Sequence, residues 1–117
     1  MPFPQKLNGA DEMWTLGYLV DCILTRDAWM HRVDTSRAVE TTMVLTPDHD
    51  GVLIDNVVKE WAGRHGQNFE LTLTGPAGGA WTHGSGGPAY ELDAVEFCRI
   101  LSGRASGDGL LTTEVPF

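Results

Sequence analysis

One long stretch with the periodicity of an α-helix constrains the fold of this chain more than any other feature. Ala10 to Arg37 contains no proline and a single glycine. Its apolar residues recur largely at spacings of three and four, as in the buried stripe of a helix: Met13, Leu16, Leu19, Val20, Ile23, Met30 and Val33. The pattern predicts one helix that is capped by Asn8 or Asp11 and ends near Ala38.

Polar side chains gather on one face of this stretch. Asp27, His31 and Asp34 stand at i, i+4 and i+7, so all three lie on the same side of a helix. A carboxylate and an imidazole one turn apart can hold a metal ion together or act as a proton-transfer pair. The alternative is structural, because nearby arginines could form salt bridges with both aspartates and leave His31 in solvent.

The chain after residue 40 predicts an α+β arrangement in which helices pack on one face of a small, mostly antiparallel sheet. Residues 39–45 are either a short strand or an extended linker. Thr46 and Pro47 mark the start of a second helix. The buried stripe of this helix comprises Ile54, Val57, Val58 and Trp61. His49 and His65, near its two ends, are expected to be solvated.

Alternating apolar and polar residues predict a strand at 69–74, and short strands at 80–83 and 89–92 follow glycine-rich turns. Asp93 caps a third helix, with Glu96 as its capping-box partner and Gly103 as its left-handed end. The buried face of this helix comprises Ala94, Phe97, Cys98 and Leu101. A final strand is predicted at residues 109–115. The two parts are therefore a long helix at 1–40 and an α/β domain at 41–117.

Composition excludes several classes of function. The chain has 117 residues and a net charge of −8, which argues against sequence-independent binding to nucleic acid or to anionic membranes. Cys22 and Cys98 fall on or beside apolar helix stripes, which favours free thiols in a reducing, cytoplasmic environment over a disulfide. The first nine residues do not have the pattern of a signal peptide, and no apolar stretch is long enough to span a bilayer.

Four stretches resemble the actinobacterial maleylpyruvate isomerase family of mycothiol-dependent enzymes. They are TLGYLVDCILTRDAWMHRVD, LTPDHDGVLIDNVVKEWAGRHG, LTLTGPAGGAWTHGSGG and LDAVEFCRILSGRASGDGLL, and the first and last are the most specific. Members of that family have a DinB-like four-helix bundle that holds a metal, followed by a domain of the sterol-carrier-protein type. The resemblance covers nearly the whole chain after about residue 12. If it holds, this chain would begin at the last helix of the family's bundle.

The resemblance implies a set of site residues. The last bundle helix of the family carries an acidic metal ligand four residues before a histidine ligand, and these positions match Asp27 and His31, with Asp in place of the usual Glu. The implied cofactors are a divalent metal, with zinc as the first candidate, and mycothiol. The arginine that the second domain contributes to activity matches Arg104, which could bind a carboxylate bidentately. Further ligands would come from missing helices, from another chain or from a second copy.

Two functions follow from these patterns. The first is a small-molecule or hydrophobic-ligand-binding module, not catalytic alone, that forms a homodimer through the long helix because its apolar surface needs a cover. The second is a metal-dependent, mycothiol-dependent isomerase or transferase, in which Asp27 and His31 bind the metal and Arg104 orients an acidic substrate.

Overall fold

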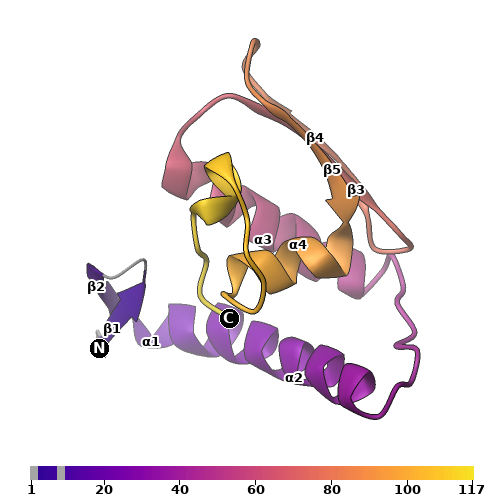
Figure 1. The fold of residues 1–117 in the computed structure, drawn as a ribbon. Helices are drawn as coiled ribbons and strands as arrows, with labels where there is room; N and C mark the ends of the chain where they lie inside the picture. The colour runs from indigo at the N-terminus through magenta and orange to yellow at the C-terminus, as the bar shows by residue number, and fades with distance from the viewer. Residues whose placement is uncertain (1–2, 8–9) are drawn as a thin grey trace.

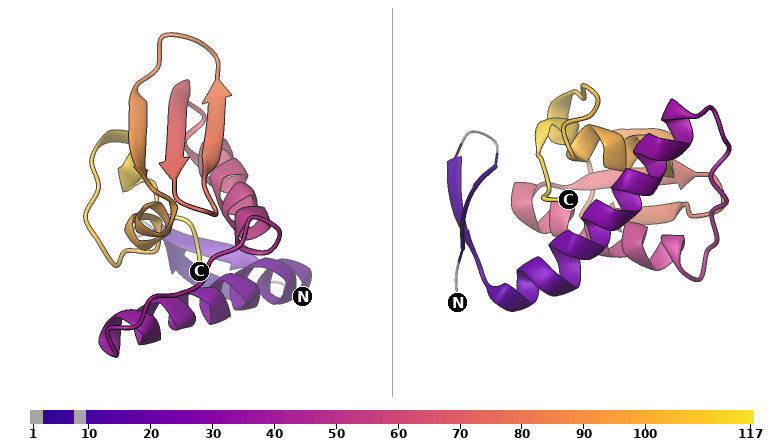
Figure 2. Two further views of the ribbon diagram at one scale, coloured as in Figure 1. Left: turned by 90° about the vertical axis from the view of Figure 1, so that its right-hand side faces the viewer. Right: turned by 90° about the horizontal axis from the view of Figure 1, so that it is seen from below.

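The computed structural model describes residues 3–7 and 10–117 of the chain. Figures 1 and 2 show three layers: a small sheet, a pair of helices against one face of it, and a long helix across the other side of that pair. The middle layer consists of α3 (Asp50–His65) and α4 (Ala94–Leu101), and the outer layer is α2 (Leu24–Ala38). The predicted α+β class, with a helix followed by a small sheet, is confirmed.

The first helix begins later than the sequence pattern predicts. Residues Phe3–Leu7 (β1) and Ala10–Trp14 (β2) pair as an antiparallel hairpin, so the predicted helix does not extend to Ala10. Thr15 is the N-cap instead, since its hydroxyl oxygen accepts a hydrogen bond from the Tyr18 amide. The alternative cap Asp11 lies within β2, and Asn8 lies outside the described residues, as do the side chains of Met13 and Val20.

From the cap onward the chain forms one continuous helical run. It passes through α1 (Leu16–Tyr18), a π-helical turn η1 (Leu19–Ile23) and α2. Ile23, Met30 and Val33 are buried as predicted, whereas Leu16 is 51% exposed. Trp29 and the charged Arg26 are also buried on the core side. This run therefore buries a narrower and less purely apolar face than the sequence suggests.

A linker connects α2 to α3. Residues 39–45 contain no strand, so of the two predicted alternatives the structure has the linker. The α3 helix begins at Asp50 rather than directly after Thr46, because residues 47–49 form a turn. The Thr46 carbonyl oxygen accepts hydrogen bonds from the amides of Asp50 and Gly51, at 3.0 and 3.2 Å. The predicted stripe from Ile54 to Trp61 is buried in the core.

The main sheet has the order β4-β3-β5 and comprises β3 (Phe69–Thr74), β4 (Gly79–His83) and β5 (Ala89–Asp93). The β3–β4 pair is antiparallel and the β3–β5 pair is parallel, so the sheet is mixed. The loop from β4 to β5 crosses the end of β3, where a Cβ atom on Gly87 would collide with the backbone of Asn68. Only glycine permits this close crossing.

The third helix and the segment after it complete the core. The Asp93 carboxylate caps α4 by accepting hydrogen bonds from the amides of Val95 and Glu96, as predicted, and Gly103 has a positive φ of 85° just past its end. The Glu96 carboxylate, predicted as the capping-box partner, pairs with Arg37 and Arg99 instead. The predicted final strand at 109–115 is wrong, because Gly109–Thr112 forms a 3₁₀ turn (η2). The core is one cluster that joins all three layers. Within residues 3–7 and 10–117, no helix is long and apolar enough to cross a membrane.

Candidate functional site

The sequence-predicted metal ligands lie beside each other on α2. The Asp27 Oδ2 and His31 Nε2 atoms are 3.4 Å apart, and the two side chains are 47% and 68% exposed. The i, i+4 spacing places them there directly, since residues four apart on a helix are surface neighbours. Both groups are therefore open to solvent and lie on a face of α2 away from the buried core.

Arg104, the predicted catalytic residue, lies just past α4 and reaches the same helix through Asp34. Its Nε donates to both oxygens of the Asp34 carboxylate at 3.0 and 2.9 Å, and its Nη2 lies 2.9 Å from Oδ2. The fold thus brings Arg104 to the helix that carries Asp27 and His31. The guanidinium edge that could bind a carboxylate bidentately already holds one, so a substrate carboxylate would have to displace Asp34.

The fit of these residues to zinc can be judged from the donor set. Among the described residues, no group of three or more histidine, cysteine, aspartate or glutamate side chains could hold a metal ion. Asp27 and His31 supply two donors, whereas a zinc site in a protein uses three protein ligands with water, or four. One copy of this chain therefore does not fit a zinc site on its described residues.

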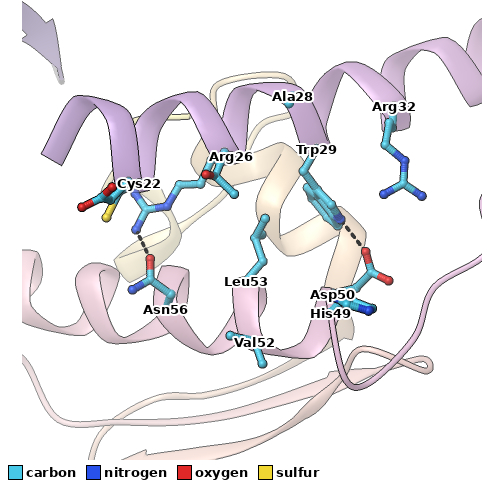
Figure 3. A pocket seen from close by; sticks show the side chains of 12 residues that line it. Cys22, Arg26, Ala28, Trp29, Arg32, His49, Asp50, Val52, Leu53 and Asn56 are labelled. Carbon is cyan, nitrogen blue, oxygen red and sulfur yellow. Dashed lines mark hydrogen bonds between the residues drawn. The ribbon is translucent and has the colours of Figure 1, made fainter. Parts of the chain in front are cut away.

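A groove between α2 and α3 is a candidate site that the sequence did not predict. Figure 3 shows its walls, with side chains of α2 projecting toward α3. Its volume is about 540 Å³, within the range of ligand pockets. The apolar part of its lining comprises Cys22, Ala28, Trp29, Val52 and Leu53, and the polar part includes Arg26, Arg32, His49, Asp50 and Asn56. Val52 is 66% exposed, so this apolar wall is open to a ligand.

Two hydrogen bonds tie the helices together at different points of the groove. The Trp29 Nε1 donates to the Asp50 carboxylate at 2.8 Å, and the Arg26 Nη2 donates to the Asn56 Oδ1 at 2.7 Å (Figure 3). Each bond joins α2 to α3 directly. The spacing of the two helices is therefore set by polar contacts as well as by apolar packing, so the groove is a defined feature of the fold.

Asp50 is a buried carboxylate in this lining. It is 5% exposed, and its Oδ2 accepts a hydrogen bond from the Thr46 amide at 2.6 Å in addition to the Trp29 bond to Oδ1. Burial alone raises the pKa of the Asp50 carboxyl, but hydrogen bonds from Thr46 and Trp29 and the nearby charge of Arg32 outweigh it and lower the pKa below the usual aspartate value. The carboxylate is therefore ionised and internally engaged.

Arg26 is the centre of a buried polar network beside the groove. It is 2% exposed and lies 2.9 Å from the Glu60 Oε1, and its Nη1 donates to the Pro116 carbonyl oxygen at 3.0 Å. The Tyr18 hydroxyl donates to the same glutamate at 2.6 Å. Burial and this glutamate together raise the pKa of Tyr18 to about 12. The network joins the first helix, α3 and the segment after η2.

Sequence reasoning missed this groove because it assigned residues to one helix at a time. One signal was available: Val52 lies outside the stripe of α3 that runs from Ile54 to Trp61, and an apolar residue off the core stripe can face a second surface. The pairing of Trp29 with Asp50 could not be predicted, because it depends on how two helices cross. Comparisons of the chain with protein-family models, with curated proteins and with solved structures found no match.

Proposed function

We propose that the chain is a small-molecule-binding module that holds a ligand with a hydrophobic body in the groove between α2 and α3. The single observation that carries this proposal is an open groove of about 540 Å³ with an exposed apolar wall. A sterol-carrier-like fold would suggest a site between sheet and helices, but Trp61, Leu71 and Phe97 fill that space and are at most 1% exposed. The groove between the helices is the better candidate.

The proposal is tested by binding of the apolar dye Nile red, followed by its fluorescence. Val52→Asp places a charge in the apolar wall, so we expect the affinity to fall at least about tenfold. Val44→Asp is the matched control, because Val44 is 78% exposed and lies outside this groove. Unchanged affinity in Val52→Asp, or equal loss in both variants, would contradict the groove as the site.

We also propose that the module is a homodimer in the cytoplasm, where Cys22 and Cys98 stay as the free thiols seen here. Exposed apolar residues along the first helical run and just past its end are Leu16, Leu24 and Val39, which are 51%, 52% and 63% exposed. A second copy would cover this surface. Native mass spectrometry should give a dimer, and Leu24→Glu should give a monomer. A monomeric parent protein at high concentration would count against this proposal.

A second candidate function is favoured by the Asp27–His31 pair. It is a metal-dependent, mycothiol-dependent isomerase or transferase, with further ligands supplied by another chain or copy. Native mass spectrometry of protein prepared without a histidine tag or chelator, with added zinc, tests it directly. We expect bound metal to be lost in His31→Ala and kept in the control His49→Ala. Metal that persists in His31→Ala would rule out this site.

A further inference from the structure

The arginines of this chain are unevenly partnered. Five of them lie within ion-pair distance of a carboxylate: Arg26 and Arg64 with Glu60, Arg37 and Arg99 with Glu96, and Arg104 with Asp34. Arg32 makes no hydrogen bond or ion pair with any described residue. In a chain with 16 acidic residues and a net charge of −8, a cation left without a carboxylate partner stands out.

Arg32 lies on the lining of the groove. Its side chain projects from α2 toward the start of α3, on the far side of Trp29 from Cys22 (Figure 3). The charge of Arg32 helps to lower the pKa of the Asp50 carboxyl. Both oxygens of Asp50 already accept hydrogen bonds, from Trp29 and from the Thr46 amide. The guanidinium of Arg32 is thus free to bind an anion that enters the groove.

The charges of the lining also give the groove a direction. Asp21 lies at the end beside Cys22, eleven residues before Arg32 on the same helical run, which is about 16 Å along a helix. Arg26 and Asp50 are buried, whereas Asp21 and Arg32 are exposed. Of the exposed charges in this lining, Asp21 therefore repels an anion at one end and Arg32 attracts it at the other. The apolar residues Trp29, Val52 and Leu53 also line this groove.

We infer that the ligand of this groove is an amphiphile with a single carboxylate, whose head group pairs with Arg32 while its hydrocarbon part packs on Trp29, Val52 and Leu53. This inference rests on the proposed binding function and narrows it to one class of ligand. Arg32 is suited to the role, because a guanidinium can bind a carboxylate through two parallel hydrogen bonds.

The test compares octanoate with 1-octanol by isothermal titration calorimetry, because the two differ in the charged head group. We expect the parent protein to prefer octanoate by about fivefold, which is the upper end of what an ion pair with an exposed side chain such as Arg32 contributes. Arg32→Gln should remove this preference by weakening octanoate alone. Arg37→Gln is the matched control, because Arg37 is on the same helix but pairs with Glu96 outside the groove.

The outcomes separate the two proposals. Equal affinity for octanoate and 1-octanol, unchanged in Arg32→Gln, would overturn the carboxylate inference and leave the binding function intact. Binding of neither compound would overturn the binding function and the inference with it. Replacing octanoate by decanoate gives a further check, since burial of each added methylene should tighten binding about fourfold. A second copy of the chain seated in the groove, detected as loss of octanoate binding on dimerisation, would also overturn the inference.

Discussion

At the scale of single residues, Arg26 is a buried cation that joins α2 to α3 and to the segment after η2. We expect Arg26→Ala to lower the free energy of unfolding by about 3 kcal/mol, because it leaves Glu60 with one fewer cation in a largely buried site. Arg64 still lies 2.7 Å from Glu60, which keeps the loss at the lower end of the range for buried pairs. Urea unfolding measures this value.

The matched control for that experiment is Arg37→Ala, on the same helix. Arg37 is 52% exposed and its pair with Glu96 is open to solvent, so its removal should cost less than about 1 kcal/mol. Similar losses in the two variants would mean that the buried network contributes no more than a surface ion pair.

His65 gives the fold a pH dependence at the residue scale. Its ring packs edge-on against Trp61 and Phe69, and its Nδ1 accepts a hydrogen bond from the Gln67 amide at 2.9 Å. Burial, with the nearby His83, lowers the pKa of His65 below the ordinary 6.5. His65 therefore binds a proton more readily in the unfolded chain than in the folded one. The contribution of neutral His65 to the free energy of unfolding is fully present above about pH 6.5 and is lost as the pH falls below that value.

The prediction is tested by urea unfolding at about pH 7.5 and about pH 5.5, a window above the range where aspartate and glutamate titrate. The parent protein should be less stable at the lower pH. His65→Phe keeps an aromatic ring but cannot take up a proton, so it should lose part of this difference, whereas the exposed His49→Gln should not. The same pH dependence in His65→Phe would show that other groups are responsible.

The expected solvation of His65 is wrong, since tertiary packing brings Trp61 and Phe69 against its ring.

At the scale of elements, two aspartates that stand at helix starts differ in how much they connect. Asp50 accepts the Trp29 indole N–H from another helix, whereas Asp93 serves only the first turn of its own helix. Asp50→Ala should lower the free energy of unfolding by about 2–3 kcal/mol, because it leaves a buried indole N–H unsatisfied as well as removing a local bond. Asp93→Ala should cost about 1 kcal/mol. Thermal unfolding of both variants checks this order, and equal shifts would contradict it.

The elements that the sequence predicted well are those set by local patterns. The alternation of β3, the apolar stripe of α3 and the Asp93 cap each depend on residues a few positions apart. The same holds for the Asp27–His31 pair, which is a matter of helical spacing alone. The metal, cofactor and catalytic roles of these residues and of Arg104 remain predictions.

The elements that the sequence predicted wrongly depend on distant partners. Residues 10–14 have a pattern compatible with a helix, but they pair with β1 instead. Residues 109–112 are also held by partners distant in the sequence. The Trp61 indole donates to the Leu110 carbonyl, and the Leu110 amide donates to the Tyr90 hydroxyl. These bonds hold the backbone in a turn, and no local propensity encodes them. The groove between α2 and α3 is likewise a product of two helices crossing.

At the scale of the whole molecule, the excess of acidic groups acts against compactness. The net charge is −8 and the radius of gyration is 14.2 Å, so the repulsion extends across the molecule at low ionic strength. Raising sodium chloride from about 20 mM to about 300 mM at neutral pH should increase the free energy of unfolding by about 0.5–1 kcal/mol. Near the isoelectric point of about 4.7 the gain should vanish or reverse, since only attractive pairs remain to be screened. Stabilisation of equal size at both pH values would point to a cause other than net charge.

The bond between Arg26 and the Pro116 carbonyl has a consequence for the order in which contacts can form during synthesis. The two residues are 90 positions apart. At a synthesis rate of roughly 5–20 residues per second, the carbonyl is made roughly 5–20 seconds after the arginine. During that interval Arg26 has its partners Asn56 and Glu60 within the synthesised chain, but its bond to Pro116 cannot yet form. The long helix, although made early, therefore gains its contact with Pro116 only after nearly all of residues 1–117 have been synthesised.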